Sequence, residues 1–240
     1  LIHCASLTNV DFSEANRSIA YASNVLLTKK LSEVSARLKV KMAFISSTGV
    51  YGNNCFLQDG LNIESSEARP LNYYHSTKFE AELAVNSLCK NPLILRVGWL
   101  FGSESPSGKD FVLARIHEMA ELTSNDKYCS NIEQFGSPTS SEFVAETISS
   151  LLLKDVSGVI NCVNDGAVSR YDLIRRIKDI CGFEFKLVGK PDKFFSRSAS
   201  VPLNETGDTS KLALYAEVSH WDDYLVKYCL KLKQYTWRVL

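Results

Sequence analysis

The sequence has no excess charge of either sign and no long apolar run, and each absence excludes a class of protein. Lys and Arg together number 27, as do Asp and Glu, so no basic field would draw the chain to nucleic acid or to an acidic membrane. No apolar run approaches the ~20 residues of a membrane span, and no charged segment followed by a secretory apolar stretch opens the chain. We therefore expect a small-molecule partner, no contact with nucleic acid or membrane, and a cytoplasmic location.

The sequence also lacks any C-x-x-C motif, although it holds seven cysteines. Their number is odd, their spacing is irregular, and several lie in apolar runs where a thiol packs as a small hydrophobic side chain. We expect a reducing compartment and assign these residues neither a metal nor a disulfide. The seven are Cys4, Cys55, Cys89, Cys129, Cys162, Cys181 and Cys229.

What the chain does have is an alternation of short apolar runs with longer amphipathic ones. This pattern is typical of βα units, in which helices cover both faces of a parallel sheet. The 240 residues suffice for one large or two closely joined domains. The sequence therefore predicts an α/β fold with a doubly wound parallel sheet. The expected strands are residues 42–45, 93–95 and 159–163, and the expected helices are 14–38, 76–88, 111–122, 140–153, 171–181 and 221–232.

Two of these helix starts have the spacing of a capping box, in which a side-chain oxygen accepts free amide hydrogens of the first turn. They are Thr139 with Glu142, and Ser169 with Asp172. Residues 182–209 follow neither period and hold Pro191, Pro202 and glycines. We expect long loops there, with room for one strand, suited to line a site.

The sharpest chemical feature is Tyr74-His75-Ser76-Thr77-Lys78, because its i, i+4 spacing sets a phenol and an ammonium on one helical face. A phenol with a pKa near ~10 is a poor acid–base catalyst at neutral pH, but a fixed cation beside it stabilises the phenolate and lowers that pKa. With ten tyrosines in the chain, chance produces one such spacing about as often as not. The Tyr74–Lys78 spacing therefore indicates a catalytic pair only if the residues upstream support one.

Upstream lies a strand that ends in small hydroxyl residues. Residues 44–52 read Phe-Ile-Ser-Ser-Thr-Gly-Val-Tyr-Gly. Ligands of open parallel sheets bind outside the carboxyl ends of the strands, where Ser47 and Thr48 would fall. A serine there can hydrogen-bond the substrate oxygen that Tyr74 protonates, although a turn-capping role explains the same residues equally well.

In this order the motifs resemble those of extended short-chain dehydrogenases/reductases, which have a Ser/Thr-bearing strand end before V-Y-G and a downstream Y-x-x-x-K. Other segments are similar to dTDP-4-dehydrorhamnose reductases in particular, and the likeness runs nearly end to end. Residues 5–11 are similar to that family's A-A-Y-T-x-V-D, residues 95–102 to its R-x-x-W-V-Y-G, and residues 133–139 to its D-Q-x-G-x-P-T. Weaker similarities cover residues 108–111, 169–172 and 208–211.

The resemblance implies a set of site residues. It makes Tyr74 the general acid, Lys78 the cation that binds the nicotinamide ribose, and Ser47 the hydroxyl that orients the substrate carbonyl. Asn24 matches a helix asparagine that supports the lysine through water. The other implied residues are Ala5, Ser6 and Thr8 at the cofactor, and Val10, Asp11, Thr48 and Trp99 at the sugar nucleotide.

Structural roles stay open for three of these residues. Asn24 also fits a polar surface position, Trp99 a core aromatic, and Asp11 a charge at a helix start. His75 lies off the Tyr74 and Lys78 face and receives no role.

The resemblance also implies the activity: NAD(P)H-dependent reduction of a 4-keto nucleotide sugar, with NADP or NAD as the cofactor. One alternative is an NAD-dependent nucleotide-sugar epimerase or dehydratase, which the Ser-Ser-x-x-Val-Tyr-Gly strand end favours. The other is a non-catalytic regulatory subunit on the same fold. A homodimer is compatible with the resemblance.

One motif of the superfamily is absent, since no G-x-G-x-x-G or G-x-x-G-x-x-G turn opens the chain. That turn lets the backbone approach a pyrophosphate at a helix N-terminus. Relative to the family, the first two βα units, about 60 residues, are missing. We therefore interpret residues 1–135 as the remainder of an N-terminally truncated NAD(P)-binding Rossmann domain, and residues 136–240 as a mainly substrate-binding region with interleaved Rossmann elements. Either the sequence is a fragment or the protein has lost cofactor binding.

Overall fold

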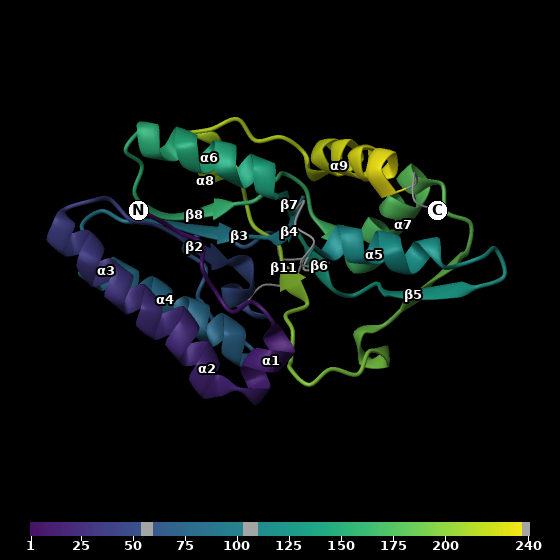
Figure 1. The fold of residues 1–240 in the computed structure, drawn as a ribbon, viewed down its shortest axis with the longest axis horizontal. Helices are drawn as coiled ribbons and strands as arrows, with labels where there is room; N and C mark the ends of the chain where they lie inside the picture. The colour runs from purple at the N-terminus through teal and green to yellow at the C-terminus, as the bar shows by residue number, and fades with distance from the viewer. Residues whose placement is uncertain (54–59, 103–109, 237–240) are drawn as a thin grey trace.

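The computed structural model describes residues 1–53, 60–102 and 110–236, and a four-stranded parallel sheet lies at its centre (Figure 1). The strands run in the order β1 (Ile2–His3), β2 (Ala43–Ser47), β3 (Leu93–Val97) and β8 (Gly158–Cys162). Every residue of β3 is buried, as expected of a strand covered on both faces. The three expected strands are confirmed to within two residues at each end.

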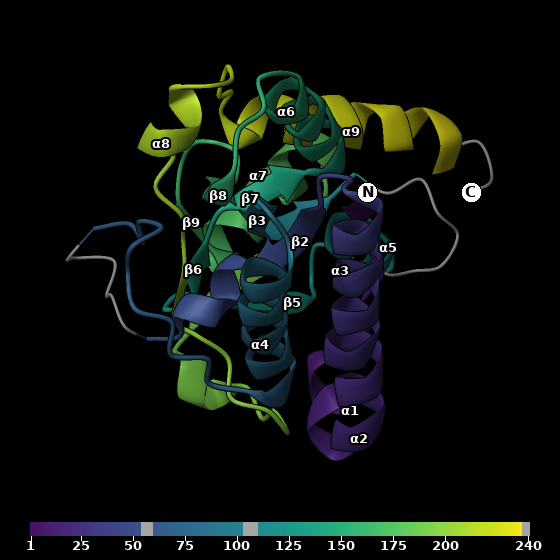
Figure 2. The same cartoon turned by 90° about the vertical axis from the view of Figure 1, so that its left-hand side faces the viewer.

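Helices cover both faces of this sheet, so the doubly wound α/β prediction is confirmed. Helices α3 (Leu27–Leu38) and α4 (Tyr73–Leu88) run side by side on one face (Figure 2). There, the side chains of Phe44 and Ile94 pack against Ala81 and Val85 of α4. On the other face α6 (Ser141–Leu153) and α8 (Ser210–Ala213) complete a second apolar core.

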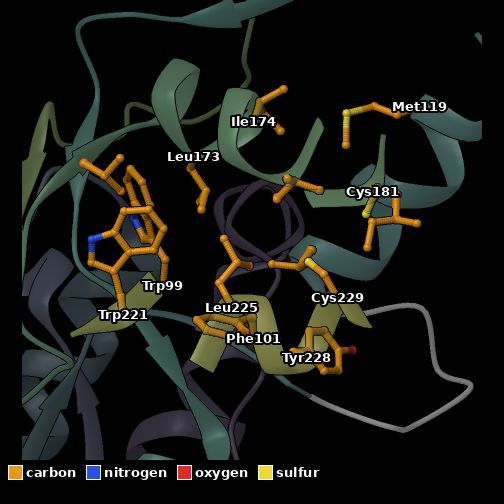
Figure 3. Packing of buried hydrophobic residues seen from close by; sticks show 14 of the residues in the cluster. Trp99, Phe101, Met119, Leu173, Ile174, Cys181, Trp221, Leu225, Tyr228 and Cys229 are labelled. Atoms are coloured by element: carbon orange, nitrogen blue, oxygen red, sulfur yellow. The ribbon is translucent and has the colours of Figure 1, made fainter. Parts of the chain in front are cut away.

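A third core lies beside the sheet, where three helices surround strand β4 (Trp99–Phe101). These helices are α5 (Phe111–Ala120), α7 (Arg170–Cys181) and α9 (Trp221–Thr236). Figure 3 shows their apolar side chains pointing toward one another, with Trp99 and Phe101 among them. The division of the chain at residue 135 stays a prediction.

Short strands from distant parts of the chain tie this region together. β4 pairs with β7 (Pro138–Ser140), and β5 (Lys127–Asn131) pairs with β10 (Lys186–Lys190). β6 (Phe135–Gly136) lies between β9 (Val168–Ser169) and β11 (Asn204–Glu205). The 3₁₀ turns η2 (Thr48–Tyr51) and η4 (Asp192–Phe194) add to the loops. Residues 182–209 thus hold two strands, β10 and β11, where we expected one at most.

The prediction of one helix over residues 14–38 is wrong. The chain forms α1 (Val10–Ala15), α2 (Arg17–Tyr21), a π-helical turn η1 (Ala22–Leu26), and then α3. Asn16 breaks the run because its backbone leaves the helical region, with φ −127° and ψ 57°. The π-helical turn displaces Asn24 so that its side chain bonds the loop after β1. The spacing of apolar residues predicts neither the break at Asn16 nor the π-helical turn.

Two helix starts also need correction. Ser140 caps α6 in place of Thr139, accepting the Glu142 amide at 3.2 Å, because Thr139 belongs to β7 and its hydroxyl donates to the Ser137 carbonyl. Helix α4 begins at Tyr73, three residues early, because Asn72 accepts the His75 amide at 2.9 Å. The Ser169 cap on α7 is confirmed by the Asp172 amide at 3.0 Å.

Cys55 and the Gly108-Lys109 pair lie outside the described residues. Within the described ranges, no helix combines the length and the apolar character that crossing a membrane requires.

Candidate active site

The candidate site lies where β1, β2 and β3 end. The register sets Phe44 beside His3, and Ser47 beside Val97, so the three strands reach the same edge of the sheet. The segment after β1, the turn η2 after β2 and the first turn of α4 all begin at this edge. The side chains expected to act on a ligand therefore come from elements that the parallel topology brings together.

Lys78 is buried at this edge with its ammonium held against the β2 backbone. Its Nζ donates to the Ile45 carbonyl at 2.5 Å and lies 4.3 Å from the centroid of the Phe44 ring. Burial lowers the pKa of Lys78 to about 8, even though the charges of Glu82 and Cys4 act in the opposite direction. The carbonyl uses one of three N–H donors, so the cation can also bind a ligand hydroxyl.

Tyr74 lies one helical turn before Lys78 and is half-buried. Burial, and after it the negative charge of Glu205, raises the pKa of the Tyr74 phenol well above its ordinary value of 10. The expected lowering of this pKa by Lys78 is therefore wrong for the free protein, and the phenol holds its proton at neutral pH. A protonated phenol at the strand ends is suited to donate a proton to a substrate oxygen.

Ser47 is half-buried at the end of β2, and its Oγ accepts the Gly49 amide at 3.1 Å. This bond shows the turn-capping role considered above, yet it leaves the serine O–H available as a donor. Thr48 is fully buried, and its hydroxyl donates to the Val97 carbonyl at 3.4 Å. Ser47 therefore remains the hydroxyl at this edge that can reach a ligand, whereas Thr48 faces the β3 backbone.

Asn24 is buried and ties the loop after β1 to α4, so it is not a polar surface residue. Its Oδ1 accepts the Leu7 amide at 2.7 Å and the Ser6 hydroxyl at 3.0 Å. Its Nδ2 donates to the Leu7 carbonyl at 3.1 Å and to Thr77 Oγ1 at 2.9 Å. Since Thr77 precedes Lys78, the asparagine fixes the distance between this loop and the buried lysine. Ser6 is half-buried, and Ala5 and Thr8 are exposed.

The other residues expected at the sugar belong to α1 and β4. Val10 and Asp11 open α1, and Asp11 Oδ1 accepts the Ala199 amide at 3.1 Å, which fixes residue 199 against this helix. Trp99 is only 8% exposed and belongs to the third core. The Arg170 guanidinium covers one face of its ring, 3.4 Å from the ring centroid.

Sequence reasoning missed three residues at this edge. His75 is buried, shares hydrogen bonds with Asn72, and leaves no room for a side chain at Gly49, where an added Cβ would lie 2.1 Å from its Nε2. Glu205 is buried and acts electrostatically on Tyr74, His75 and Arg170. The similarity over residues 169–172 and the predicted helix start covered Arg170 without indicating its contact with Trp99, and Glu205 carried no signal, because it belongs to a short strand whose partner lies far away in the sequence.

A parallel α/β sheet with a serine, a tyrosine and a lysine at its carboxyl edge defines the extended short-chain dehydrogenase/reductase class. Within it, the chain belongs to the family described as the RmlD substrate binding domain, whose model matches residues 1–234.

Relatives and solved structures agree with this placement. The chain is 29% identical over 189 residues to dTDP-4-dehydrorhamnose reductase of Mycobacterium tuberculosis, covering 76% of this chain and 59% of the relative. It is 27% identical over 182 residues to dTDP-4-keto-6-deoxy-D-glucose reductase of Streptomyces niveus, covering 73% and 58%. The chain thus spans less than two thirds of these curated relatives.

Among solved structures, dTDP-4-dehydrorhamnose reductase of Clostridium acetobutylicum superposes with a TM-score of 0.88 at 26% identity, covering 97% of this chain and 80% of that one. The Bacillus anthracis reductase, solved in complex with NADP, gives a TM-score of 0.87 at 23% identity, covering 96% and 79%. The second similarity bears on the fold alone.

Proposed function

We propose that the whole protein reduces the 4-keto group of a nucleotide sugar with NADPH or NADH. The observation that carries this proposal is the pairing of a phenol that keeps its proton, Tyr74, with a buried ammonium, Lys78, at the strand ends. The phenol is thus in the protonated form that a proton donor in reduction needs, and the charge of Lys78 would favour the phenolate as the proton leaves. The relatives that are named as reductases also support reduction as the reaction.

The residues present fit the nicotinamide half of a dinucleotide. Lys78 offers ammonium donors for ribose hydroxyls, and Asn24 holds the Ser6–Leu7 backbone beside α4. Ala5 and Thr8 extend the same loop. A bound reduced nicotinamide would supply the hydride. The described residues include no glycine-rich turn for the pyrophosphate, so we assign no contact to that half.

This chain's residues would act on the substrate in a fixed arrangement. The Ser47 hydroxyl donates to the keto oxygen and orients it, while its lone pair remains on the Gly49 amide. The Tyr74 hydroxyl gives its proton to the same oxygen as that oxygen becomes an alcohol. Lys78 stabilises the resulting phenolate, since a cation nearby favours the charged form. Val10, Asp11 and Trp99 stay predicted contacts of the sugar nucleotide.

The first test replaces the proton donor in the full-length natural protein. Tyr74→Phe should lower the rate of NADPH oxidation with a 4-keto nucleotide sugar by about 10²-fold or more, the scale of a lost general acid. Tyr73→Phe is the matched control, because Tyr73 shares the same helical turn and its ring contacts Arg17 at 5.0 Å. Wild-type turnover by Tyr74→Phe, with chemistry rate-limiting, would show that the donor is another group.

The stoichiometry of the same assay separates the alternatives. A reductase oxidises one NADPH or NADH for each sugar consumed, whereas an epimerase or dehydratase converts the sugar without net loss of reduced cofactor. A regulatory subunit does neither. A homodimer and a cytoplasmic location stay predictions, to be tested by sedimentation and by fractionation.

A further inference from the structure

A cluster of polar groups with too few partners lies beside Tyr74, outside the serine, tyrosine and lysine already described. Its centre is Glu205, a carboxylate only 8% exposed. One oxygen, Oε1, accepts from Gln134 Nε2 at 3.2 Å. The other oxygen has no hydrogen-bond partner among the residues that the structure describes, and the carboxylate forms no ion pair there. That oxygen is therefore available to accept a hydrogen bond from a ligand.

The elements around Glu205 bring it to the site. Strand β11, which carries Glu205, lies against η2, the turn that follows Ser47. On its other side β11 lies next to β6 (Figure 1), and the pairing of these two strands sets Glu205 opposite Gly136. Gly136 in turn touches Trp99, since an added Cβ would lie 2.2 Å from that ring. Glu205 therefore lies between the catalytic edge and Trp99, and its charge acts on Tyr74 and His75.

Two further groups of the cluster have donors without acceptors. The Arg170 guanidinium stacks on the rings of Trp99 and Phe111, at 3.4 and 4.5 Å from their centroids, and makes no ion pair within 4.0 Å in the described part of the chain. Trp99 Nε1 is buried and has no hydrogen-bond partner among the described residues. A carboxylate acceptor, a guanidinium and an indole donor thus meet without satisfying one another.

Such a set matches a polyhydroxyl ligand. Sugar hydroxyls donate to carboxylates and accept from guanidinium and indole N–H groups, and buried polar groups with too few partners in the free protein commonly gain them from a ligand. We propose that Glu205 is a specificity-determining residue that accepts a hydroxyl hydrogen of the sugar ring, next to the carbon that is reduced, with Arg170 donating to a neighbouring ring oxygen. This proposal rests on the proposed function, because that function makes the ligand a nucleotide sugar.

Binding tests the proposal apart from turnover. In the full-length protein, titration calorimetry compares dTDP-glucose with dTDP, which share the nucleotide and differ in the sugar. Wild-type protein should bind dTDP-glucose more tightly, and Glu205→Gln should reduce affinity for dTDP-glucose by about 10- to 100-fold, the scale of a hydrogen bond to a charged group. Affinity for dTDP should not change. The matched control is Glu133→Gln, because Glu133 precedes Gln134 and bonds the Asp192 amide instead of the cluster.

The calorimetric comparison either supports or overturns the role proposed for Glu205. Equal affinities of wild-type and Glu205→Gln protein for dTDP-glucose would overturn the proposal, as would a wild type that binds dTDP-glucose no better than dTDP. Glu205→Ser repeats the test if Glu205→Gln does not fold, as judged by circular dichroism. Failure of the proposed function appears separately, as absence of NADPH oxidation with a 4-keto sugar, and does not alter the binding comparison.

In a working reductase, Glu205→Gln should raise KM more for a 3-hydroxy substrate than for its 3-deoxy analogue.

Discussion

Lys78 combines a proposed role in the reaction with a cost to the stability of the fold. The residue is 3% exposed, and burial lowers the pKa of its ammonium from 10.5 to about 8. Below pH 8 the folded protein carries the whole cost of a buried cation. Between pH 8 and 10.5 the unfolded chain holds a proton that the folded chain has released, so stability rises with pH across that window.

Replacing this cation should therefore stabilise the fold while removing the activity. Lys78→Met keeps the length and apolar packing of the side chain, and we expect the free energy of unfolding at pH 7 to rise by about 1–3 kcal/mol. Urea denaturation at pH 7 and pH 10 measures the difference in free energy of unfolding between the variant and the wild type. This difference should be smaller at pH 10, where Lys78 of the folded wild type is neutral. A Met variant less stable than wild type at pH 7 would mean that the bond to Ile45 outweighs the burial cost.

Arg96 and Glu82 form the opposite case, a buried pair in which each charge needs the other. Arg96 Nη2 lies 2.7 Å from Glu82 Oε2, and their side chains are 6% and 4% exposed. Glu82→Leu leaves the guanidinium uncompensated above the Tyr51 ring, so we expect a loss of about 3–5 kcal/mol. Glu82→Leu with Arg96→Met should recover much of it in the same denaturation series. A double variant no more stable than the single one would contradict this account.

At the scale of the elements, the spacing of apolar residues predicted the strands and helices that form from regular apolar and amphipathic runs. The three central strands and the helices α5, α6, α7 and α9 follow from the alternation of short and long apolar runs. The strands β6, β9 and β11 have two residues each and exist because partners far away in the chain supply their hydrogen bonds. No local pattern can report such strands, and for the same reason the break at Asn16 and the π-helical turn went unpredicted.

The π-helical turn can be tested through Asn24. Asn24→Leu removes the bonds to both backbone groups of Leu7 and to Thr77, and we expect a loss of about 2 kcal/mol or more because buried polar groups lose their partners. Hydrogen exchange of the Leu7 amide should accelerate. Ser23→Ala in the same turn should leave that amide unchanged. Unaltered Leu7 protection in Asn24→Leu would show that the loop does not depend on the asparagine.

Across the whole molecule, the sequence located one half of the candidate site and missed the other. Ser47, Tyr74 and Lys78 were predictable because a strand end and an i, i+4 spacing are local patterns. Glu205 and Arg170 were not, because β11 and the start of α7 reach Tyr74 and Trp99 only through the pairing of β11 with β6 and of β6 with β9. The residues that we propose for catalysis are thus encoded by local patterns, whereas the groups that we propose to select the sugar depend on the complete topology.

The last prediction concerns the 240-residue chain on its own. Among the residues that the structure describes, β1 is the last strand of the sheet and pairs with β2 alone, and Leu1 and Ile2 are 47% and 50% exposed. An unpaired parallel edge with exposed apolar residues invites association, so this chain should show concentration-dependent light scattering. Because the contacts that we propose for Lys78 and the Ser6–Leu7 loop are with the nicotinamide half alone, calorimetric titration of this chain with NADPH should show no micromolar binding. Micromolar NADPH binding by a monodisperse 240-residue monomer would mean that the strand ends alone can hold the dinucleotide, and the role given to the glycine-rich turn would have to be abandoned.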